Sequence, residues 1–550
     1  MRIVLILLLL FCANRLLSQP PPWEMYYVQF SDKNNNPYSA GNPLQFLSQR
    51  SIDRRSRENI EITEEDLPVN PSYVDSLEKI CDKIVFTTKW LNGATVQIHD
   101  MAQIALIDSL PFVKSISEVH IKTPGDGYYA LEKSNMLAAV SGPSVGDYGQ
   151  SYTQMAVEKG NVLHDLGYYG AGKLISVHDA GFQNVNTLTT FDSLRNNNGI
   201  VAVHDFILNN DSVYVQGEHG MWVMSLMTGQ LPGQLIGVAP KANFLLLRSE
   251  NEYSESLVEL YAWVSAAEFA DSAGADIITS SLGYTTFDDA FMNYTYLDMN
   301  GVTTPISKAA EIASSKGMVV VSAAGNSGQQ AWHYISAPAD ANNILAVGSC
   351  NYNSTMSAFS SYGPTADGRI KPDVDAVGNN NVIASLVDGQ VTSGAGTSFA
   401  TPIIAGLTAC LWEAFPDKTN MQIMDAVRRS ASKYTNPDDS CGYGIADFDL
   451  AYQYLKHSTI PSSDYIAEAY PNPTSNNLTI SFFSNSDQEA DLALIDMLGR
   501  QYLQHVYIAN ANDFNTFTVG NLSPLPNGVY ILVIKTANNV LTQKIVKQGE

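Results

Sequence analysis

The sequence is poor in cysteine, in basic residues and in long apolar runs. Five cysteines in 550 residues exclude a disulfide-rich scaffold, and their wide spacing gives no zinc-ligand pattern. Lys and Arg number 31 against 55 Asp and Glu, and the formal net charge of −24 argues against nucleic acid or an anionic membrane as partner. The longest apolar run, Ile3 to Ala13, is too short to cross a bilayer.

That apolar run follows a single basic residue, Arg2, which is the pattern of a secretory signal peptide. We expect cleavage after Ser18, so that residues 1–18 are removed together with Cys12. The pairing of the four cysteines that remain is left open by the sequence: Cys81, Cys350, Cys410 and Cys441.

The length predicts three or four structural units. Residues 19–122 mix strand-like stretches, "MYYVQF" and "ATVQIHD", with short helical ones, "PSYVDSLEKI" and "AQIALIDSL", which predicts a small α+β unit. Residues 123–150 are rich in Gly, Ser and Pro, which predicts an exposed connection that a protease can cut.

Residues 151–455 alternate apolar strands with helical stretches, which predicts an α/β fold with a parallel sheet covered on both faces. In such sheets the functional groups lie on loops at the carboxyl ends of the strands. After a polar linker at 456–465, residues 466–550 contain only short strands separated by Asn, Gly, Pro and Ser. The last unit is therefore expected to be a small immunoglobulin-like β-sandwich.

The stretch "SGAGTSFATPIIAG" places Ser398 at the start of an apolar helix. Ser398 is either a helix cap or a nucleophile to which the preceding small residues give close access. A nucleophilic serine needs a base and an acid that orients the base. His219, between a Gly-rich loop and a helical run, is the candidate base, although an isolated histidine there is more often a surface or capping residue.

Asp179 ends the apolar strand "KLISVHD" and is either a turn residue or the acid that orients the base. Asn326 follows the strand "GMVVVSAAG" and is either part of an Asn-Ser-Gly turn or a donor to an oxyanion, with the Ser398 amide as second donor.

The chain resembles the subtilisin-like serine peptidases in the chain order of its candidate residues, which is Asp179, His219, Asn326 and Ser398. It also resembles them in the stretches "HDAGF", "GVAPKANFLLLR", "SSLG", "AAGNSG", "FSSYGP", "KPDV" and "GTSFATP". The resemblance runs from about Ala171 to Ala451. It implies a catalytic triad of Asp179, His219 and Ser398 and an oxyanion donor in Asn326. The residues that it implies in substrate binding are Ser281, Leu282, Gly283, Ala323, Ala324 and Gly325.

Two departures from the family pattern lie near the triad. His219 is followed by Gly-Met-Trp, which leaves any substrate preference near the base open, and His178 directly precedes Asp179. No metal ligand is assigned: structural calcium is usual in that family and compatible with the acidity, but no loop has a recognisable ligand spacing.

Both flanking units carry further resemblances. Residues 24–122 resemble the family's inhibitory pro-domain, with the mature boundary between Val119 and Gln150, and "YPNP", "DMLGR" and "NGVY" after residue 466 resemble the sorting domain of the type IX secretion system of Bacteroidetes. These resemblances imply a zymogen that crosses the periplasm and is secreted or held at the outer-membrane cell surface. The implied partners are protein or peptide substrates, the chain's own pro-domain and the secretion machinery, and we expect a monomer.

Two other classes of function fit the sequence less well than an exported endopeptidase. An adhesion protein built on an inactive peptidase fold would lack a triad member, and none is missing. An α/β-hydrolase needs its acid and its histidine after the serine, but only His457 and His505 follow Ser398, in the linker and the sandwich.

Overall fold

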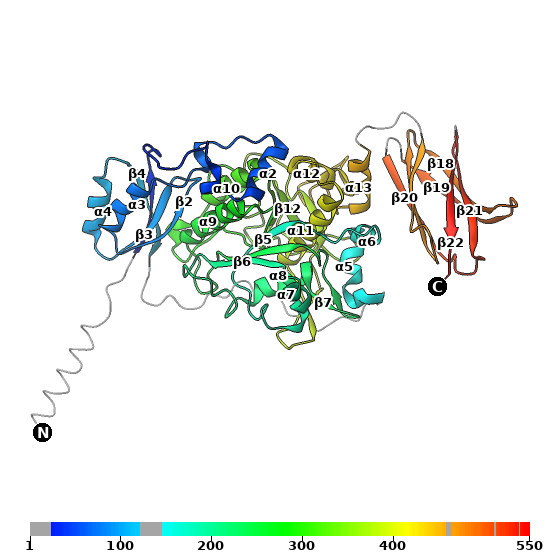
Figure 1. Ribbon diagram of the computed structural model, residues 1–550, viewed down its shortest axis with the longest axis horizontal. Coiled ribbons are helices and arrows are strands. Elements are labelled where there is room, and N and C mark those ends of the chain that lie inside the picture. Colours follow the sequence, from blue (N-terminus) through cyan, green and yellow to red (C-terminus); the bar gives the residue numbers. More distant parts are fainter. Residues whose placement is uncertain (1–23, 122–145, 458–463, 511–512, 538, 550) are drawn as a thin grey trace, which may run out of the picture.

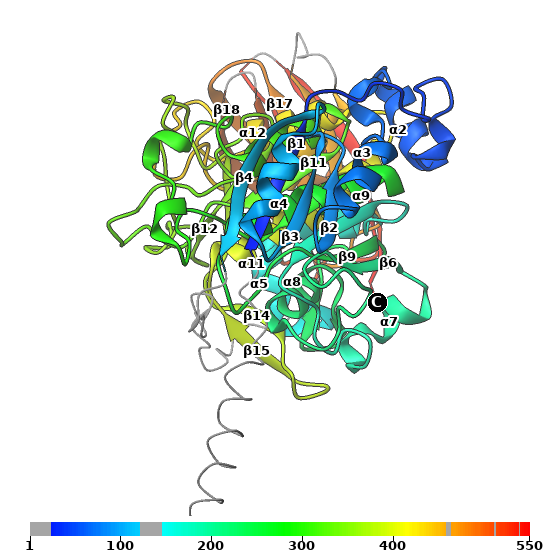
Figure 2. The same ribbon diagram turned by 90° about the vertical axis from the view of Figure 1, so that its left-hand side faces the viewer.

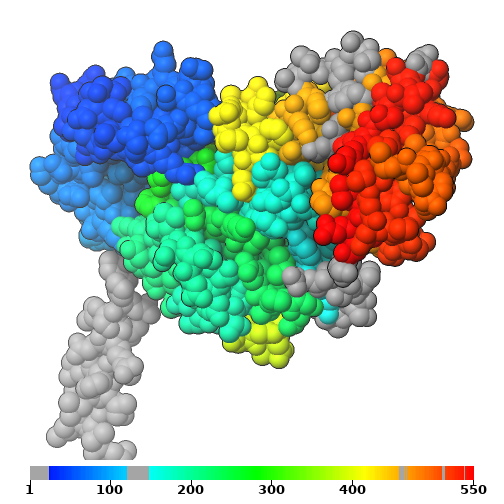
Figure 3. Space-filling view, turned by 45° about the vertical axis from the view of Figure 1, so that its right-hand side comes forward, coloured from blue at the N-terminus to red at the C-terminus, as the bar shows by residue number. Residues whose placement is uncertain are grey.

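The computed structural model describes residues 24–121, 146–457, 464–510, 513–537 and 539–549. The expected signal peptide and most of both expected linkers lie outside these residues. Three units follow one another along the chain, and Figure 3 shows the N-terminal and C-terminal units at opposite ends of the central unit. Within the described residues, no helix has the length and apolarity needed to cross a membrane.

The N-terminal unit is the α+β unit that the sequence predicts, a four-stranded antiparallel sheet in the order β2-β3-β1-β4 with short helices beside it. Its apolar core is separate from that of the central unit and includes Val28, Leu77 and Val96. The elements are β1 (Glu24–Phe30), α2 (Gln49–Glu58), α3 (Pro71–Glu78), β2 (Lys83–Thr88), β3 (Gly93–Ile98), α4 (Met101–Asp108) and β4 (Val113–Ile121).

The central unit is built on a seven-stranded sheet in which every neighbouring pair of strands is parallel. Parallel strands need long crossovers, and the alternating strand and helix pattern of the sequence supplies them. The order across the sheet is β13 (Val374–Val377), β12 (Leu345–Cys350), β11 (Val319–Ala323), β10 (Ile277–Ser280), β5 (Leu174–Asp179), β9 (Asn243–Arg248) and β6 (Ile200–Asp205).

Helices cover both faces of this sheet, so the predicted three-layer α/β fold is confirmed (Figure 1). One face packs on α8 (Glu218–Thr228) and the long buried α11 (Thr397–Ala414), and the other on α9 (Leu257–Ala273) and α10 (Pro305–Ser315). The other α-helices of this unit are α5 (Tyr152–Ala156), α6 (Gly160–Asp165), α7 (Asp192–Asn196), α12 (Asn420–Arg429) and α13 (Phe448–Lys456). Two short antiparallel pairs of strands complete the unit. They are β7 (Gln230–Leu231) with β8 (Leu235–Ile236), and β14 (Asn381–Ala384) with β15 (Val391–Gly394).

The N-terminal unit sits on the outer side of α9, with its sheet in front of that helix in Figure 2. Asp271 of α9 is fully buried there and accepts ion pairs from Arg54 at 2.6 Å, Arg55 at 2.9 Å and Lys89 at 3.0 Å. Burial raises the pKa of the Asp271 carboxyl, but these three charges outweigh it and hold the pKa below its usual range. The contact between the N-terminal unit and α9 therefore contains a network of buried charges in which Asp271 is paired with cations of the N-terminal unit.

The C-terminal unit consists of two antiparallel sheets, β16-β17-β20 and β19-β18-β21-β22, over one apolar core, as the sequence predicts. A hydrogen bond from Thr516 to Asp449 of α13, 3.1 Å long, joins it to the central unit. The strands are β16 (Tyr465–Tyr470), β17 (Leu478–Ser484), β18 (Gln488–Asp496), β19 (Gln501–Ala509), β20 (Asp513–Val519), β21 (Gly528–Lys535) and β22 (Val540–Lys547).

Candidate active site

The carboxyl edge of the central sheet brings together the four polar residues that the sequence singles out. Asp179 is the last residue of β5, His219 the second residue of α8, and Ser398 the second residue of α11, while Asn326 follows β11. The last three line one cavity of about 970 Å³. Chain segments far apart in sequence meet there because parallel strands end at the same edge.

Asp179, which is fully buried, and His219, which is partly exposed, form a hydrogen-bonded pair. Oδ1 of Asp179 lies 2.8 Å from Nδ1 of His219 and also accepts the Ala180 amide at 2.8 Å. Burial lowers the pKa of His219, but the charge of Asp179 and its hydrogen bond, helped by Glu252 and Glu250, outweigh burial and raise it. With Nδ1–H donating to Asp179, the other ring nitrogen, Nε2, is left to accept a proton.

Glycines allow this pair to form, because the loop after β5 and the start of α8 pack backbone against backbone. A Cβ on Gly217 would lie 2.4 Å from Cα of Gly181, and one on Gly220 would lie 2.1 Å from the Gly181 carbonyl oxygen. Gly217 also has φ +83°, a conformation that favours glycine. The close approach brings His219 within reach of Asp179.

Ser398 lies inside the first turn of α11 and does not cap it. The N-cap position is Gly396, and no side chain caps the helix there. The Ser398 hydroxyl donates to the carbonyl oxygen of Ser281 at 3.2 Å. No hydrogen bond among the described residues joins Ser398 to His219, so the hydroxyl must turn before His219 can accept its proton.

Asn326 reaches across to α11 and does not close a turn with its own side chain. Its Oδ1 accepts from the amide of Thr397 at 2.8 Å and from the Thr397 hydroxyl at 3.0 Å, which leaves Nδ2 as the donor end. A Cβ built on Gly396 would lie 3.7 Å from Nδ2 of Asn326 and 3.7 Å from the amide nitrogen of Ser398. Both donors therefore border the same small space in front of Gly396.

Five of the six residues expected to contact substrate line the cavity: Ser281, Leu282, Gly283, Ala323 and Gly325. The sixth, Ala324, is not among the lining residues, because it is fully buried in a small apolar cluster with Ile335. A Cβ on Gly283 would come within 2.1 Å of the Ser336 hydroxyl, and one on Gly325 within 3.2 Å of it. These glycines leave a narrow uncharged recess beside Ser336.

The two departures from the family pattern lie away from the cavity lining. His178 is fully buried between Ser176, 3.1 Å from its Nε2, and the ring of Trp263, and burial lowers its pKa to about 3. Met221 is buried in the main core, and the half-buried Trp222 packs edge-on against Phe399. His178 is thus a neutral core residue.

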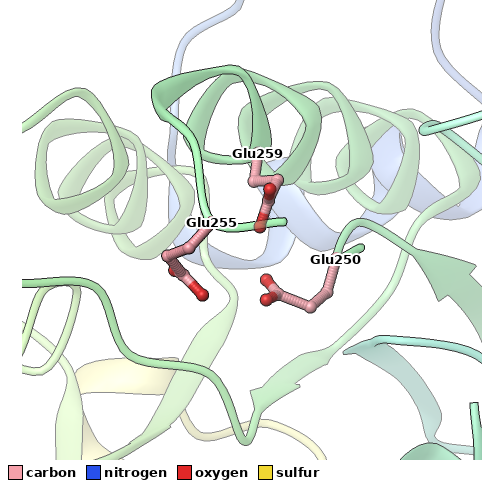
Figure 4. A group of neighbouring side chains, drawn as sticks. All are labelled: Glu250, Glu255 and Glu259. Carbon is pink, nitrogen blue, oxygen red and sulfur yellow. The ribbon is translucent and has the colours of Figure 1, made fainter. Parts of the chain in front are cut away.

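Sequence reasoning missed an acidic group in the same region, Glu250, Glu255 and Glu259, here called the glutamate cluster (Figure 4). Each side chain offers one oxygen, and these oxygens lie within 4.8 Å of one another. In the sequence these glutamates appear in the segment "ENEYSESLVE", five and four residues apart. That spacing matches the period of neither a helix nor a strand, because the group spans the loop after β9 and the start of α9.

Carboxylate oxygens suit calcium, and subtilases commonly bind structural calcium. The glutamate cluster supplies three oxygens, whereas calcium takes six to eight ligands. The Tyr284 hydroxyl donates to an oxygen of Glu250, and the Ser256 amide donates to an oxygen of Glu259 at 3.1 Å, so one oxygen of each of these carboxylates already accepts a hydrogen bond. The donor set present does not complete a calcium shell.

Comparison with known proteins gives three family matches. The model of the subtilase family matches residues 170–444, half of the chain. A peptidase S8 propeptide domain of Bacteroidota matches residues 25–130, and a secretion system C-terminal sorting domain matches residues 468–548. The sorting domain indicates export, with secretion or attachment at the cell surface.

Curated serine proteases are similar to part of the chain. Serine protease AprX of Bacillus subtilis is 31% identical over 38% of this chain and 50% of its own, and a thermophilic serine proteinase of a Bacillus species is 27% identical over 44% and 54%. The chain thus spans about half the length of these two relatives. Thermitase of Thermoactinomyces vulgaris is 28% identical over 52% of this chain and 90% of its own.

Proposed function

Because the chain belongs to the subtilase family, we propose that it is an exported serine endopeptidase that hydrolyses peptide bonds through Asp179, His219 and Ser398. The observation that carries the proposal is the hydrogen bond of 2.8 Å between the buried Asp179 and His219, which lines the same cavity as Ser398. A histidine oriented by a buried carboxylate beside a serine at a helix start is the arrangement that acyl transfer requires.

The reaction begins when the Ser398 hydroxyl turns from the Ser281 carbonyl toward Nε2 of His219. Oγ then attacks the peptide carbonyl carbon, and His219 takes the proton while Asp179 stabilises the imidazolium. The oxyanion lies in the space in front of Gly396, where Nδ2 of Asn326 and the Ser398 amide donate to it. His219 next protonates the leaving amine as the C–N bond breaks. A water molecule then attacks the ester carbonyl and gives a proton to His219, and the bond to Ser398 Oγ breaks as His219 returns the proton to it.

Substrate would bind as an extended strand along Ser281 to Gly283, because that backbone continues β10 at the mouth of the cavity. The recess between Gly283, Gly325 and Ser336 is uncharged, which favours an apolar side chain next to the scissile bond. We assign substrate contact there to Leu282 and Ala323, and a supporting position behind the recess to Ala324.

The N-terminal unit is proposed to act as the inhibitory pro-domain of a zymogen, held by the buried pairs of Asp271. The domain boundaries that we propose are 19–122 for the pro-domain, 123–150 for the processing linker, 151–455 for the peptidase domain and 466–550 for the sorting unit. Partners beyond substrate and pro-domain are the type IX secretion machinery, and the proposed oligomeric state is a monomer.

A structural calcium ion stays outside this proposal, since the glutamate cluster supplies only part of the ligands that calcium needs. The proposed steps are carried out by side chains, backbone amides and water.

Labelling with a fluorophosphonate tests the triad assignment. The purified protein should be modified on Ser398, located by peptide mass spectrometry, and should cleave casein or a mixed peptide library. Ser398→Ala should remove both signals, with a loss in kcat of about 10⁶-fold, the magnitude known for subtilisin. Ser254→Ala serves as the matched control, because it removes another serine on the same cavity that should not be the labelled residue. An active Ser398→Ala protein would show that the assignment is wrong.

A further inference from the structure

The glutamate cluster belongs to the same cavity as Ser398. Two of its members, Glu250 and Glu255, line that cavity, and Glu259 lies behind them with 1% of its surface exposed. Glu252 and Asp288 line it as well, whereas none of its described lining residues is Lys or Arg. This part of the cavity therefore attracts cations.

One oxygen of the cluster receives no N–H or hydroxyl donor from the described residues. Oε1 of Glu259 accepts from the Ser256 amide at 3.1 Å and from the Ser256 hydroxyl at 3.3 Å, whereas Oε2 is buried and accepts from no such group. Figure 4 shows the three carboxylates pointing toward one another, from the loop after β9 and the start of α9. A hydrogen bond between the Glu250 and Glu259 carboxyls requires a shared proton, so it serves only while one of the two is protonated. When both are ionised, the buried oxygen calls for a donor from outside the cluster.

The spacing of the oxygens fits an ammonium group. The three oxygens lie no more than 4.8 Å from one another, which is close enough for one nitrogen placed among them to reach all three at about 2.8 Å, the usual length of a charge-assisted N–H···O bond. A lysine ammonium carries three donors around one nitrogen, one for each carboxylate. An arginine guanidinium presents a planar fork instead, which suits one carboxylate better than three that converge on a point.

The charges around the cluster agree with an incoming cation. Burial raises the pKa of Glu250 to about 7. The charge of Asp179 adds to the rise, whereas hydrogen bonds from the Tyr284 hydroxyl and the Glu259 carboxyl and the charge of His219 oppose it. Burial and the neighbouring carboxyls also raise the pKa of Glu255 and Glu259 well above the usual range, with Asp288 acting on Glu255 and the Ser256 amide opposing the rise at Glu259. A cation bound between the three would stabilise their ionised forms.

The cluster lies beyond the residues next to Ser398. Tyr284, which bonds to Glu250, is three residues past Ser281, and an extended chain rises about 3.3 Å per residue, or roughly 10 Å over that stretch. If a substrate strand pairs with this backbone, the side chain that reaches the cluster belongs to a substrate residue about three positions from the scissile bond.

We propose that the glutamate cluster is a specificity site that binds the ammonium of a substrate lysine about three residues from the bond that is cut. The inference rests on the proposed peptidase function and adds a substrate class to it: peptides with a lysine at this distance and an uncharged residue at the bond. It assigns a direct contact with substrate to Glu250 and Glu255, which line the cavity, and a supporting position behind them to Glu259.

A set of fluorogenic peptides tests the site. The peptides are identical except at one position, scanned from two to five residues before the bond, which carries Lys, Arg, Gln or norleucine. At one position, Lys should raise kcat/KM over Gln by about tenfold and exceed Arg, as expected for charge-assisted bonds. Glu255→Gln and Glu250→Gln should bring Lys and Gln within about twofold of each other. Glu252→Gln, which removes an acid on the same cavity outside the cluster, should keep the preference for Lys.

The other possible outcomes distinguish a failure of the specificity site from a failure of the proposed peptidase function. Cleavage of the neutral peptides without a lysine preference at any position, or a preference that survives both Glu250→Gln and Glu255→Gln, overturns the specificity site and leaves the peptidase intact. Absence of cleavage and of fluorophosphonate labelling overturns both. A rise in melting temperature with CaCl₂ that Glu255→Gln abolishes, without any lysine preference, shows that the cluster is a calcium site instead. A lysine preference unchanged by EGTA supports the proposal.

Discussion

Ser281 and Ser398 hold each other by two reciprocal hydrogen bonds. The hydroxyl of Ser281 donates to the carbonyl oxygen of Ser398 at 2.9 Å, and the hydroxyl of Ser398 donates to the carbonyl oxygen of Ser281 at 3.2 Å. The first bond ties the start of α11 to the end of β10, and the second holds the proposed nucleophile in a resting position. Attack on substrate breaks only the second bond, so the first can keep the helix in place throughout the reaction.

Removing the first bond should slow acylation without unfolding the protein. Ser281→Ala deletes one hydrogen bond to the backbone of Ser398, worth about 0.5–1.5 kcal/mol, so we expect a fall of about two- to tenfold in the single-turnover acylation rate. Ser254→Ala, which removes another hydroxyl that lines the same cavity, is the matched control and should leave the rate unchanged. An acylation rate in Ser281→Ala equal to that of the control would mean that the bond does not position Ser398.

The pH dependence of activity should report on His219. Its pKa is raised above the usual 6.5, so the imidazole stays protonated, and unable to accept the serine proton, until a higher pH. We expect kcat/KM to rise with pH through a midpoint above 6.5. Glu252→Gln removes one of the charges that raise this pKa and should move the midpoint to lower pH, whereas Asp417→Asn, an exposed charge elsewhere, should not. A midpoint that moves upward in Glu252→Gln would contradict the electrostatic account.

The sequence predicts the scaffold well because strand and helix patterns are local. The stretch "KLISVHD" predicts β5 with Asp179 at its carboxyl end, and "SESLVELYAWVSAAEFADSAG" predicts α9. The assignment of His219 depended on the family resemblance, because its approach to Asp179 relies on backbone packing at Gly181 that no local pattern reveals.

Contacts between distant segments were not predictable from the sequence. The reciprocal bonds of Ser281 and Ser398 join residues 117 positions apart, and the buried pair of Arg54 with Asp271 joins two units of the chain. The glutamate cluster was missed for a related reason, since its members share a site only after β9 and α9 have packed against each other.

Truncation before the C-terminal unit should separate export from catalysis. That unit has its own apolar core, so a chain that ends near residue 460 should fold and keep its activity. In the native host it should collect inside the outer membrane, which cell fractionation and immunoblotting would detect. Thr516→Val, which deletes the hydrogen bond to Asp449 but keeps the unit, is the control and should be exported normally. Normal surface or medium levels of the truncated protein would refute the sorting role.

Asn326→Ala should reduce kcat by about 10²–10³-fold with little change in KM, the magnitude measured for loss of this donor in subtilisin. The structure adds a second role, because Oδ1 of Asn326 also accepts from the amide and hydroxyl of Thr397. Thr397→Val removes the hydroxyl contact alone and should cost much less activity. Melting temperature and single-turnover acylation, measured on the same preparations, separate the roles. A fall in acylation below tenfold together with a drop of several degrees would mean that Asn326 is structural.

Gly396→Ala tests the space between the two proposed oxyanion donors. Its Cβ would lie 3.7 Å from Nδ2 of Asn326 and from the amide of Ser398, an ordinary contact distance, and the backbone at Gly396 is extended, so the variant should fold with a melting temperature near that of the parent. The methyl group would nevertheless stand where the oxyanion forms and hinder both donors, so we expect acylation to fall by about 10²-fold or more. Since both substitutions act on the same site, the double variant Asn326→Ala/Gly396→Ala should lose far less than the product of the single losses. Fully multiplicative losses would place the two residues at independent sites and contradict the shared oxyanion space.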